Sequence, residues 1–491
     1  MNREKNYLAI DIGASSGKAI CGTLKNGKMT LNEVSRFVNE PVLINGSLRW
    51  NILSLWTDVL NCISACLNQG FENISSVGID TWGVDFVFLD EMGHVLQNPF
   101  HYRDEITSDV EKWIEDKIHE QDLYEITGLR IGRVTTLSQM VSLKMKLRWL
   151  FDVARTFLMM PDFFRYLLSG NIACELTNAG SSQLLDIRTK KWSKKIFDTF
   201  NLPLNIMPEI VYPGTIAGKL RKEISGKFHC KNTNVSVVAG HDTASAAAAV
   251  PFVDQNTLFI SSGTWAVFGL ISKFPQTDDR TFKAGFINEP GFDCILVVRN
   301  MAGLYLFENF YRRLFEKDRK ITYRKMIESA MDSSGFQLFL NPNDHLFFSI
   351  ENGEIALKKY CDSTGQKYPE RMADILRAIL EGIALSFKKP LEDIQACTGR
   401  TFEKICIVGG GVKNKLLCQM IADATGLQVI TGPSEAAAVG NLCIQAFADG
   451  EIQDISRIRD MAASSCKVNI FQPKNTDRWE KQYQRFKHLY F

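Results

Sequence analysis

The sequence predicts an α/β protein made of two related lobes, each a mixed β-sheet covered by helices. Three observations lead to this prediction. The chain has 491 residues, and a single hydrophobic core stops growing at roughly 250–300 residues, so two domains are expected. The first 90 residues alternate between strand-like and helix-like patterns. A strand, a turn of glycine, serine and threonine, and a second strand then recur after residue 233.

Composition and charge narrow the function classes. Hydrophobic residues make up 45% of the chain and charged residues 23%, which excludes a disordered or collagen-like protein. Lysine and arginine total 57 against 55 acidic residues, for a net charge of +2. A chain with this balance carries no electrostatic signature of a nucleic-acid or membrane-surface partner. We therefore expect a small-molecule partner, with no nucleic acid and no membrane.

Cysteine spacing and the N-terminal sequence bear on the compartment. The 12 cysteines form no Cys-x-x-Cys pair and have no histidine at metal-ligand spacing, so we expect free thiols that pack as small apolar groups. The N-terminus enters a strand without an apolar leader, and no run reaches about 18 uncharged apolar residues. These features predict a cytoplasmic protein without a transmembrane helix.

The elements of the first lobe follow a regular order. An Asn-Gly pair at residues 26–27 is a strong signal for a hairpin between two strands. Residues 105–230 are more helical and more charged, and we interpret them as an elaboration of this lobe. Strands are expected at residues 7–12, 18–24, 29–37 and 76–79, and a helix at residues 53–67.

The second half of the chain repeats this order. We expect the lobe boundary near residues 245–255, which gives an N-terminal domain at residues 1–248 and a C-terminal domain at residues 249–491. Strands are expected at residues 236–239, 257–261, 267–271 and 405–408, and a helix at residues 416–424.

A turn rich in glycine and serine follows the first predicted strand at residues 13–17. Glycine lets successive backbone N–H groups converge on an anion, and the hydroxyls of Ser15 and Ser16 add donors. Asp11, at the end of the strand, is placed to contact a metal-bound water beside phosphates. The motif is not a Walker loop, and an ordinary hairpin turn is the alternative interpretation.

Two further turns of this kind lie in the second lobe, at residues 261–265 and 409–411. Three consecutive glycines are entropically costly, so either a ligand lies against this backbone or a strand and a helix pack tightly there. Together the three turns favour a nucleotide held between the lobes.

Asp242 comes directly before an alanine-rich stretch, which predicts a helix that packs closely against a neighbour. Aspartate at a helix start is most simply an N-cap. The alternative is a general base that removes a proton from a substrate hydroxyl, with His241 hydrogen-bonding the same substrate.

A strand ends in polar and aromatic residues at positions 76–85. The carboxylates of Asp80 and Asp85 could accept hydrogen bonds from sugar hydroxyls, and the ring of Trp82 could cover sugar C–H groups. A solvent-facing turn with a half-buried tryptophan is the alternative.

Together these motifs resemble those of the FGGY carbohydrate kinases, in the family's order from residue 7 to about residue 447. The resemblance implies a two-lobed actin/hexokinase-like (ribonuclease H-like) fold with the active site in the cleft between the lobes. The matching motifs lie at residues 11–17, 78–86, 160–162, 240–245, 261–265, 341–344, 408–411 and 432–436.

The resemblance also implies a reaction. The γ-phosphoryl group of ATP would pass to the 1-hydroxyl of a ketose, with Mg²⁺ bridging the phosphates. L-Rhamnulose is the expected acceptor, and L-fuculose or another ketose such as D-xylulose is the alternative. The alternative from another class is a catalytically silent regulator that binds sugar or nucleotide on the same fold. A monomer or a homodimer is expected.

Residue by residue, Asp242 matches the family's catalytic base and Asp11 an acid near the metal. Glu308 stands where similar members usually carry a glutamine near the nucleotide. Besides Asp242, the sugar-binding positions are matched by Gly83, His241, Thr243 and Asn300, to which the strand-end motif adds Asp80 and Trp82. The nucleotide-binding positions are Gly13, Ala14, Ser15, Ser16, Gly17, Thr264, Glu308 and Gly410.

Overall fold

The computed structural model describes residues 4–347 and 352–490. Contacts divide the chain into two compact units, and both are discontinuous in sequence. The first unit comprises Met1–Pro251, Ile271–Val297 and Glu435–Ser465. The second comprises Phe252–Leu270, Val298–Ser434 and Cys466–Phe491. The α/β class is confirmed, and the division of the sequence into residues 1–248 and 249–491 stays a prediction.

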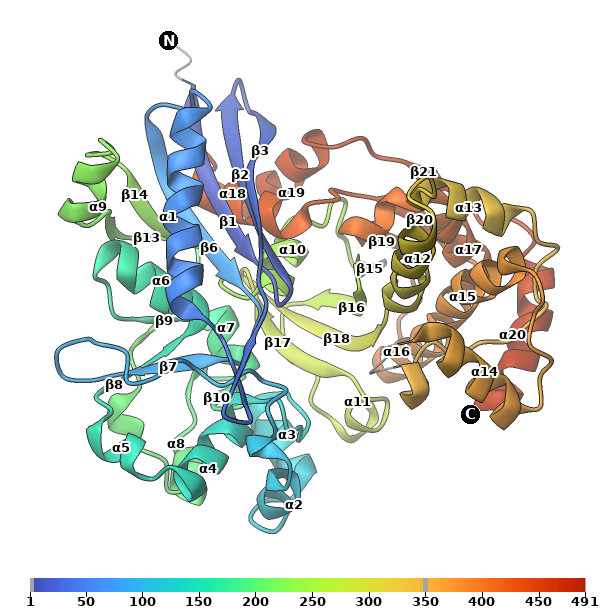
Figure 1. The fold of residues 1–491 in the computed structure, drawn as a ribbon, viewed down its shortest axis with the longest axis horizontal. Helices are drawn as coiled ribbons and strands as arrows, with labels where there is room; N and C mark the ends of the chain where they lie inside the picture. Colours follow the sequence, from blue (N-terminus) through green and yellow to red (C-terminus); the bar gives the residue numbers. More distant parts are fainter. Residues whose placement is uncertain (1–3, 348–351, 491) are drawn as a thin grey trace. The chain divides into compact units, whose positions relative to one another are not determined.

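The first unit is built on a six-stranded sheet in the order β13-β14-β6-β1-β2-β3 (Figure 1). β1 is antiparallel to β2 and parallel to β6, so the sheet is mixed, as predicted. Asn26 and Gly27 both have positive φ, 53° and 74°, and form the predicted hairpin turn. The strands are β1 (Lys5–Ile12), β2 (Ser16–Lys25), β3 (Lys28–Val38), β6 (Ile74–Thr81), β13 (Thr215–Lys219) and β14 (Asn234–Val237).

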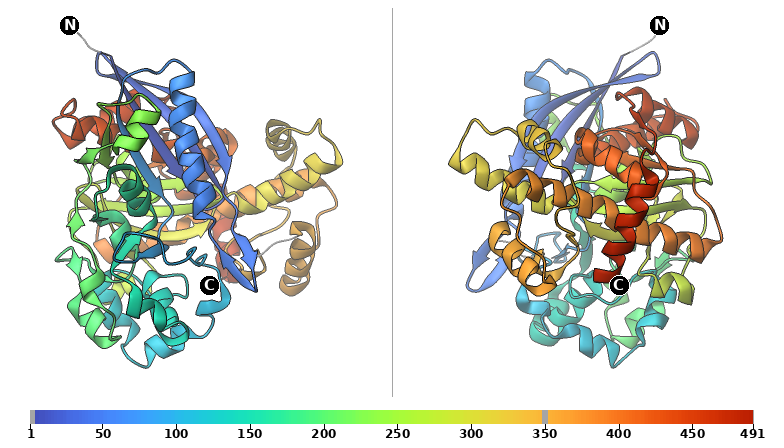
Figure 2. Two further views of the ribbon diagram at one scale, coloured as in Figure 1. Left: turned by 60° about the vertical axis from the view of Figure 1, so that its left-hand side comes forward. Right: turned by 90° about the vertical axis from the view of Figure 1, so that its right-hand side faces the viewer.

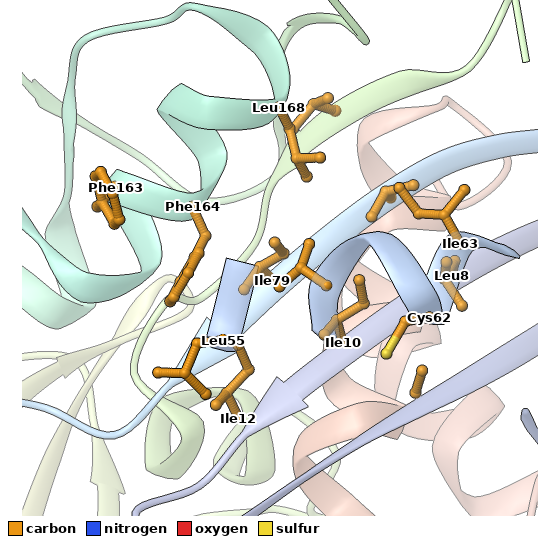
Figure 3. Close-up of a cluster of buried hydrophobic side chains, with 14 of the residues drawn as sticks. Leu8, Ile10, Ile12, Leu55, Cys62, Ile63, Ile79, Phe163, Phe164 and Leu168 are labelled. Atoms are coloured by element: carbon orange, nitrogen blue, oxygen red, sulfur yellow. The ribbon is translucent and has the colours of Figure 1, made fainter. Parts of the chain in front are cut away.

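Helix α1 (Ile52–Asn68) runs along β1–β3, as both views in Figure 2 show, and its start is capped by the side chain of Asn51. Its apolar residues recur at helical spacing, and Leu55 lies beside Ile12 of the sheet (Figure 3). The predicted helix at residues 53–67 is thus confirmed, and it covers one face of the first sheet.

The opposite face is covered by α18 (Ala436–Ala448), from the C-terminal part of the chain. Side chains alternate between the two faces of a strand, and Leu8 packs in the core that contains α1. A Cβ added to Gly78, which pairs with the neighbouring Ala9, would lie 2.6 Å from the Asn441 side chain of α18. The sheet of the first unit is therefore sandwiched between helices.

Helix α10 (Asp242–Ala248) is the predicted alanine-rich helix, and it packs against α18. The approach is very close, because a Cβ added to Gly440 would lie 1.8 Å from the Ser245 carbonyl oxygen. Small residues on both helices make this contact, as the sequence predicted.

Most helices within residues 105–230 contribute to a second apolar cluster of the first unit, as expected for an elaboration, whereas the helices Met160–Ser169 and Lys222–Lys227 pack in the core that contains α1, and β13 joins the main sheet. Strands β7 (Phe86–Leu89) and β8 (Thr156–Met159) pair beside this second cluster. The helices are α2 (Val110–Glu115), α3 (Glu120–Thr127), α4 (Thr136–Lys146), α5 (Trp149–Val153), α6 (Met160–Ser169), α7 (Leu176–Ser181), α8 (Lys194–Thr199) and α9 (Lys222–Lys227).

A seven-stranded sheet has the order β17-β18-β16-β15-β19-β20-β21. β15 is antiparallel to β16 and parallel to β19, which repeats the arrangement of β1 with β2 and β6, so the predicted recurrence is confirmed. The strands are β15 (Thr257–Ser262), β16 (Trp265–Ser272), β17 (Ile287–Gly291), β18 (Cys294–Ala302), β19 (Lys404–Val408), β20 (Gln428–Thr431) and β21 (Ile470–Phe471).

Helices of the second unit fill most of the sequence between β18 and β20. The predicted helix at residues 416–424 is confirmed as α17 (Lys415–Thr425). The others include α12 (Tyr305–Lys317), α13 (Tyr323–Met331), α14 (Gly353–Thr364), α15 (Met372–Ser386), α16 (Lys388–Thr398) and the C-terminal α20 (Thr476–Tyr490).

None of the 12 cysteines forms a disulfide bond, and all but two are buried, as expected from their spacing. Within residues 4–347 and 352–490, no helix combines the length and the apolar character needed to cross a membrane.

Replacing Gly440 with alanine is expected to destabilise the first unit, because α10 and α18 would have to move apart. Overpacking of this kind costs about 1–3 kcal/mol. Gly226→Ala in α9 is the control, because a Cβ there would meet no atom within 4 Å. Urea unfolding followed by circular dichroism compares the two variants. Equal free energies of unfolding would contradict the tight packing of the two helices.

Candidate active site

Acidic side chains gather at the carboxyl ends of the central strands of the first unit. Asp11 on β1 and Asp80 on β6 are register partners in the parallel pair, so they lie side by side. Asp242 begins α10, which follows β14. Burial raises the pKa of both Asp11 and Asp80, and the charge of Asp242 adds to both shifts.

Lys18 on β2 provides a positive charge for this acidic group. Its Nζ lies 3.1 Å from Asp11 Oδ2 and 2.7 Å from Glu435 Oε2. Burial disfavours the charged lysine, but the two carboxylates outweigh burial and raise its pKa, so it stays protonated. Burial raises the pKa of Asp11, and Lys18 opposes that shift. Acidic groups outnumber this lysine, so the cluster suits a bound cation.

Asp80 is fully buried, and its contacts are with the protein interior. Its Oδ2 accepts a hydrogen bond of 2.6 Å from Asn441 Nδ2, and Gln445 Nε2 donates to Asn441 Oδ1 at 2.7 Å. Burial, followed by the charge of Asp11, raises the pKa of Asp80 well above its usual value. Its predicted contact with a sugar stays a prediction, and its observed contacts anchor β6 to α18.

Asp242 is the first residue of α10, and the capping position is His241. Neither residue's side chain makes a capping hydrogen bond to a helix N–H; the Asp242 carboxylate accepts one from Thr243 Oγ1 at 3.2 Å. Its side chain is 32% exposed. The N-cap interpretation is therefore not what the structure shows, and the carboxylate is accessible for proton transfer.

His241 and Gly83 lie against each other beside this carboxylate. The Thr81 N–H donates to the Gly240 carbonyl at 2.8 Å and so ties the end of β6 to the start of α10. A Cβ on Gly83 would lie 3.2 Å from His241 Nε2 and 2.9 Å from Ser181 Oγ, so a larger residue would require these side chains to shift. His241 Nε2 is 3.6 Å from Asp242 Oδ1. The structure thus brings Gly83, which belongs to a separate sequence motif, next to His241 and Asp242.

Glu289 is a site residue that sequence reasoning missed. Its Oε2 lies 3.9 Å from His241 Nδ1, a buried nitrogen without a hydrogen-bond partner in the described chain. Glu289 is 7% exposed on β17. The sequence signal was an acidic residue within a short strand, too weak to interpret alone.

The Met-Pro-Asp motif at residues 160–162 is connected by hydrogen bonds, through Glu175, to the residue before His241. Asp162 accepts a hydrogen bond from the Glu175 N–H at 3.0 Å, and Glu175 Oε2 in turn accepts from the Gly240 N–H at 2.8 Å. Glu175 also caps α7 through two N–H groups, and burial raises its pKa to about 7. These hydrogen bonds hold the backbone of Gly240, the residue before His241, in place.

The turn at residues 13–17 joins β1 to β2 as a hairpin, and neither of its glycines has a positive φ. The Gly13 N–H donates to the Ser16 carbonyl at 2.9 Å. Asn39 binds the outward carbonyls, donating from its N–H to Ser15 O at 3.1 Å and from Nδ2 to Gly13 O at 2.9 Å. Ser15 and Ser16 are exposed. Their hydroxyls are therefore available to a ligand.

The second unit holds its own group of predicted nucleotide-binding residues. Thr264 Oγ1 donates to Glu308 Oε2 at 3.1 Å, and burial raises the pKa of Glu308. The triglycine at residues 409–411 packs against Ser262: a Cβ on Gly411 would lie 2.1 Å from its Oγ. Gly410 faces open space, where nothing lies within 4 Å of an added Cβ. Tight packing therefore explains Gly409 and Gly411, while a ligand lying against Gly410 stays a prediction.

Asn300, the remaining predicted sugar-binding residue, lies on β18 of the second unit, and its side chain is exposed. It stays a prediction.

Known proteins match the chain along most of its length. Residues 6–249 match the N-terminal domain of the FGGY family of carbohydrate kinases, and residues 258–448 match its C-terminal domain. The chain belongs to this family. The acidic cluster and the glycine turns described above therefore belong to an FGGY carbohydrate kinase.

Among curated relatives, a rhamnulokinase of Bacteroides thetaiotaomicron is 34% identical over 485 residues, which covers 99% of both chains. A rhamnulokinase of Bacillus subtilis is 32% identical over 473 residues, 96% of both chains.

Solved structures of other kinases share the fold of this FGGY protein. A xylulose kinase from Lactobacillus acidophilus superimposes with a TM-score of 0.81 at 16% identity, covering 99% of this chain and 97% of that chain. A glycerol kinase from Plasmodium falciparum, solved with ADP, gives a TM-score of 0.80 at 15% identity, covering 99% and 98%. The predicted two-domain kinase fold is confirmed by these likenesses.

Replacing Lys18 with glutamine is expected to lower the free energy of unfolding by about 3 kcal/mol, because it leaves Asp11 and Glu435 without their cation. The loss should shrink on acidification, because protonated carboxyls no longer need the lysine. Lys25→Gln on the same strand is the control, since its ion pair with Glu4 is exposed and contributes less than about 1 kcal/mol. Denaturant unfolding at two pH values measures both. An equal effect of the two substitutions would contradict the buried role of Lys18.

Proposed function

We propose that this protein transfers the γ-phosphoryl group of ATP to the 1-hydroxyl of L-rhamnulose. The proposal rests on the similarity to rhamnulokinases over nearly the full length of the chain. The FGGY kinase domains and the acidic cluster of the first unit are consistent with it. We also propose the cytoplasm, where ATP is available, as its location, and a monomer or homodimer as its assembly.

The sugar is held by the residues that surround His241. The imidazole and the Gly83 backbone hold its hydroxyl groups, and Thr243 adds a hydrogen bond. Trp82, which precedes Gly83, forms part of the wall. Glu289, facing His241 Nδ1, orients the imidazole.

Asp242 is the general base in this proposal. Its partly exposed carboxylate takes the proton of the 1-hydroxyl as that oxygen bonds to the γ-phosphorus. The bond from the γ-phosphorus to the β–γ bridging oxygen breaks, and ADP leaves with the electron pair. Phosphoryl transfer needs little covalent chemistry from the protein, so positioning and charge stabilisation lower the barrier.

The nucleotide is held by backbone turns. The N–H groups and hydroxyls of residues 13–17 bind phosphate oxygens in the first unit. In the second unit Thr264, Glu308 and Gly410 serve the nucleotide, Glu308 through the oxygen that is not bonded to Thr264.

The residues present fit a Mg²⁺ ion. Among residues 4–347 and 352–490, no three histidine, cysteine or acidic side chains form a complete ligand set. Mg²⁺ bound with a nucleotide needs only one or two carboxylates, because phosphates and water complete its shell. Asp11, in a cluster with excess negative charge, is the carboxylate that would hold it. When bound, the ion neutralises charge on the phosphates.

An ADP-release assay with L-rhamnulose, L-fuculose, D-xylulose and L-ribulose tests the proposal. We expect the highest kcat/KM with L-rhamnulose and no turnover without a sugar. A higher kcat/KM for another ketose would reassign the substrate. ATP binding by calorimetry without turnover of any ketose would favour a silent regulator.

Asp242→Asn is expected to lower kcat by roughly 10²–10⁴-fold, because the amide cannot accept the hydroxyl proton. The KM for ATP should change little, since the phosphate loop is untouched. Asp198→Asn, which removes an exposed acid of α8, is the control and should keep full activity. Steady-state kinetics of both variants provide the measurement; full turnover by Asp242→Asn would remove this residue from the base role.

A further inference from the structure

The backbone between β6 and β7 is held in a strained shape. Val84 has a φ of +70°, a conformation that β-branched residues rarely adopt. Thr136 Oγ1 donates to the Val84 carbonyl at 2.6 Å, and the Val84 N–H donates to Ser181 Oγ at 3.2 Å. Strain of this kind persists only where the surroundings fix the chain, and it concentrates at functional sites.

Asp85, the next residue, is a fully buried carboxylate that faces hydrogen-bond donors. Its Oδ2 accepts from Trp50 Nε1 at 2.6 Å and from Trp82 Nε1 at 2.8 Å. Its Oδ1 accepts from Gln139 Nε2 at 2.8 Å. An indole nitrogen can only donate, so neither tryptophan could accept a proton from a neutral Asp85.

The orientation of Gln139 is fixed as well. Its Nε2 also lies 3.2 Å from the Val134 carbonyl oxygen and 3.4 Å from the Val84 carbonyl oxygen. A flipped amide would turn its own oxygen toward both carbonyls. The pocket therefore satisfies the ionised carboxylate, and a proton on Asp85 would break at least one of its hydrogen bonds.

Trp50 and Trp82, which donate to Asp85, form an aromatic wall together with His101, next to the residues proposed to bind the sugar. The rings of Trp50 and Trp82 lie 4.1 Å apart, and His101 lies 4.4 Å from Trp50. Trp82 is followed directly by Gly83, where an added Cβ would lie 3.2 Å from His241 Nε2, so Gly83 and His241 are neighbours. A change in the charge of Asp85 therefore affects the proposed sugar site through Trp82, which bonds Asp85 and precedes Gly83.

We propose that Asp85 is a positioning residue for the sugar: as a carboxylate it locks Trp82 and Gly83 against His241, and its protonation releases them and weakens sugar binding. The inference rests on the proposed function. In this proposal Asp85 does not contact the sugar itself; its protonation state controls the position of residues that do.

Among Asp85, His101 and Tyr102, only Asp85 has a pKa near neutral pH. Burial raises the pKa of Asp85 to about 7, and the hydrogen bonds from Trp50, Trp82 and Gln139 oppose the shift. Burial lowers the pKa of His101 to about 4 and raises that of Tyr102, so both stay neutral from pH 6 to 8.

Other charged groups lie close by. The charges of Arg103 and Asp242 both act on Tyr102, although burial is the largest cause of its raised pKa. Glu175, behind Gly240, also has a pKa of about 7 and could produce a similar pH dependence. The experiment must therefore separate Glu175 from Asp85.

The test is the pH dependence of the KM for L-rhamnulose between pH 6 and 8. At one pH unit below its pKa, about nine-tenths of an acid is protonated, so the wild-type KM should rise up to roughly tenfold toward pH 6. Asp85→Asn should show a raised KM without this pH dependence. Glu175→Gln should keep it. Trp50→Phe removes one donor, so the rise should begin at a higher pH.

A second measurement does not need activity. Near-ultraviolet circular dichroism of the tryptophans should change with a midpoint near pH 7 in the wild type and not in Asp85→Asn. A missing midpoint, or one that persists in Asp85→Asn and disappears in Glu175→Gln, would overturn the inference. If L-rhamnulose is turned over but its KM profile is unchanged in Asp85→Asn and Trp50→Phe, the inference fails while the kinase function stands. If no ketose is turned over, the proposed function fails and the spectroscopic midpoint alone tests whether Asp85 controls the aromatic wall.

Discussion

Buried carboxyl groups near the end of one sheet place the strongest constraint on how the elements of the first unit pack together. Removing a carboxylate from water is costly unless donors or cations replace the lost hydration. Asp11 has Lys18, Asp85 has two indoles and an amide, and Glu175 has backbone and hydroxyl donors. The partners come from β2, α4 and α7 and from the segments that hold Trp50 and Trp82. The strands, the alanine-rich helix and the helical elaboration must therefore all be in place before the acids are satisfied.

Much of this architecture could be predicted from local patterns. The hairpin at residues 26–27, the helix at residues 53–67 and the strands that carry Asp11 and Asp80 depend on neighbouring residues, so the sequence displays them directly. The position of Asp242 could be predicted too, but its role could not, because an N-cap and a general base have the same local pattern. The missing capping bond argues against the N-cap, and only the folded structure shows it, while the base role stays a proposal.

The supporting residues were beyond sequence reasoning for a physical reason. Gln139 lies 54 positions from Asp85, and Glu175 lies 65 positions from Gly240. Neither has a spacing that signals a partner, because their contacts form only when separate elements fold together. Val84 gave no signal either, since a valine in a left-handed conformation contradicts the propensity of its side chain. Departures from local rules of this kind are expected where tertiary contacts build a site.

Helix α18 explains why residues from the C-terminal part of the chain belong to the first unit. Gly440 allows α18 to touch the backbone of α10, while Asn441 bonds Asp80 and Gln445 donates to the Leu8 carbonyl at 3.0 Å. Apolar packing alone would tolerate a small rotation or shift of this helix. Buried amides do not, because a shift would leave Asp80 and a backbone carbonyl without donors. The polar contacts therefore set the register of α18, and with it the position of Glu435 beside Lys18.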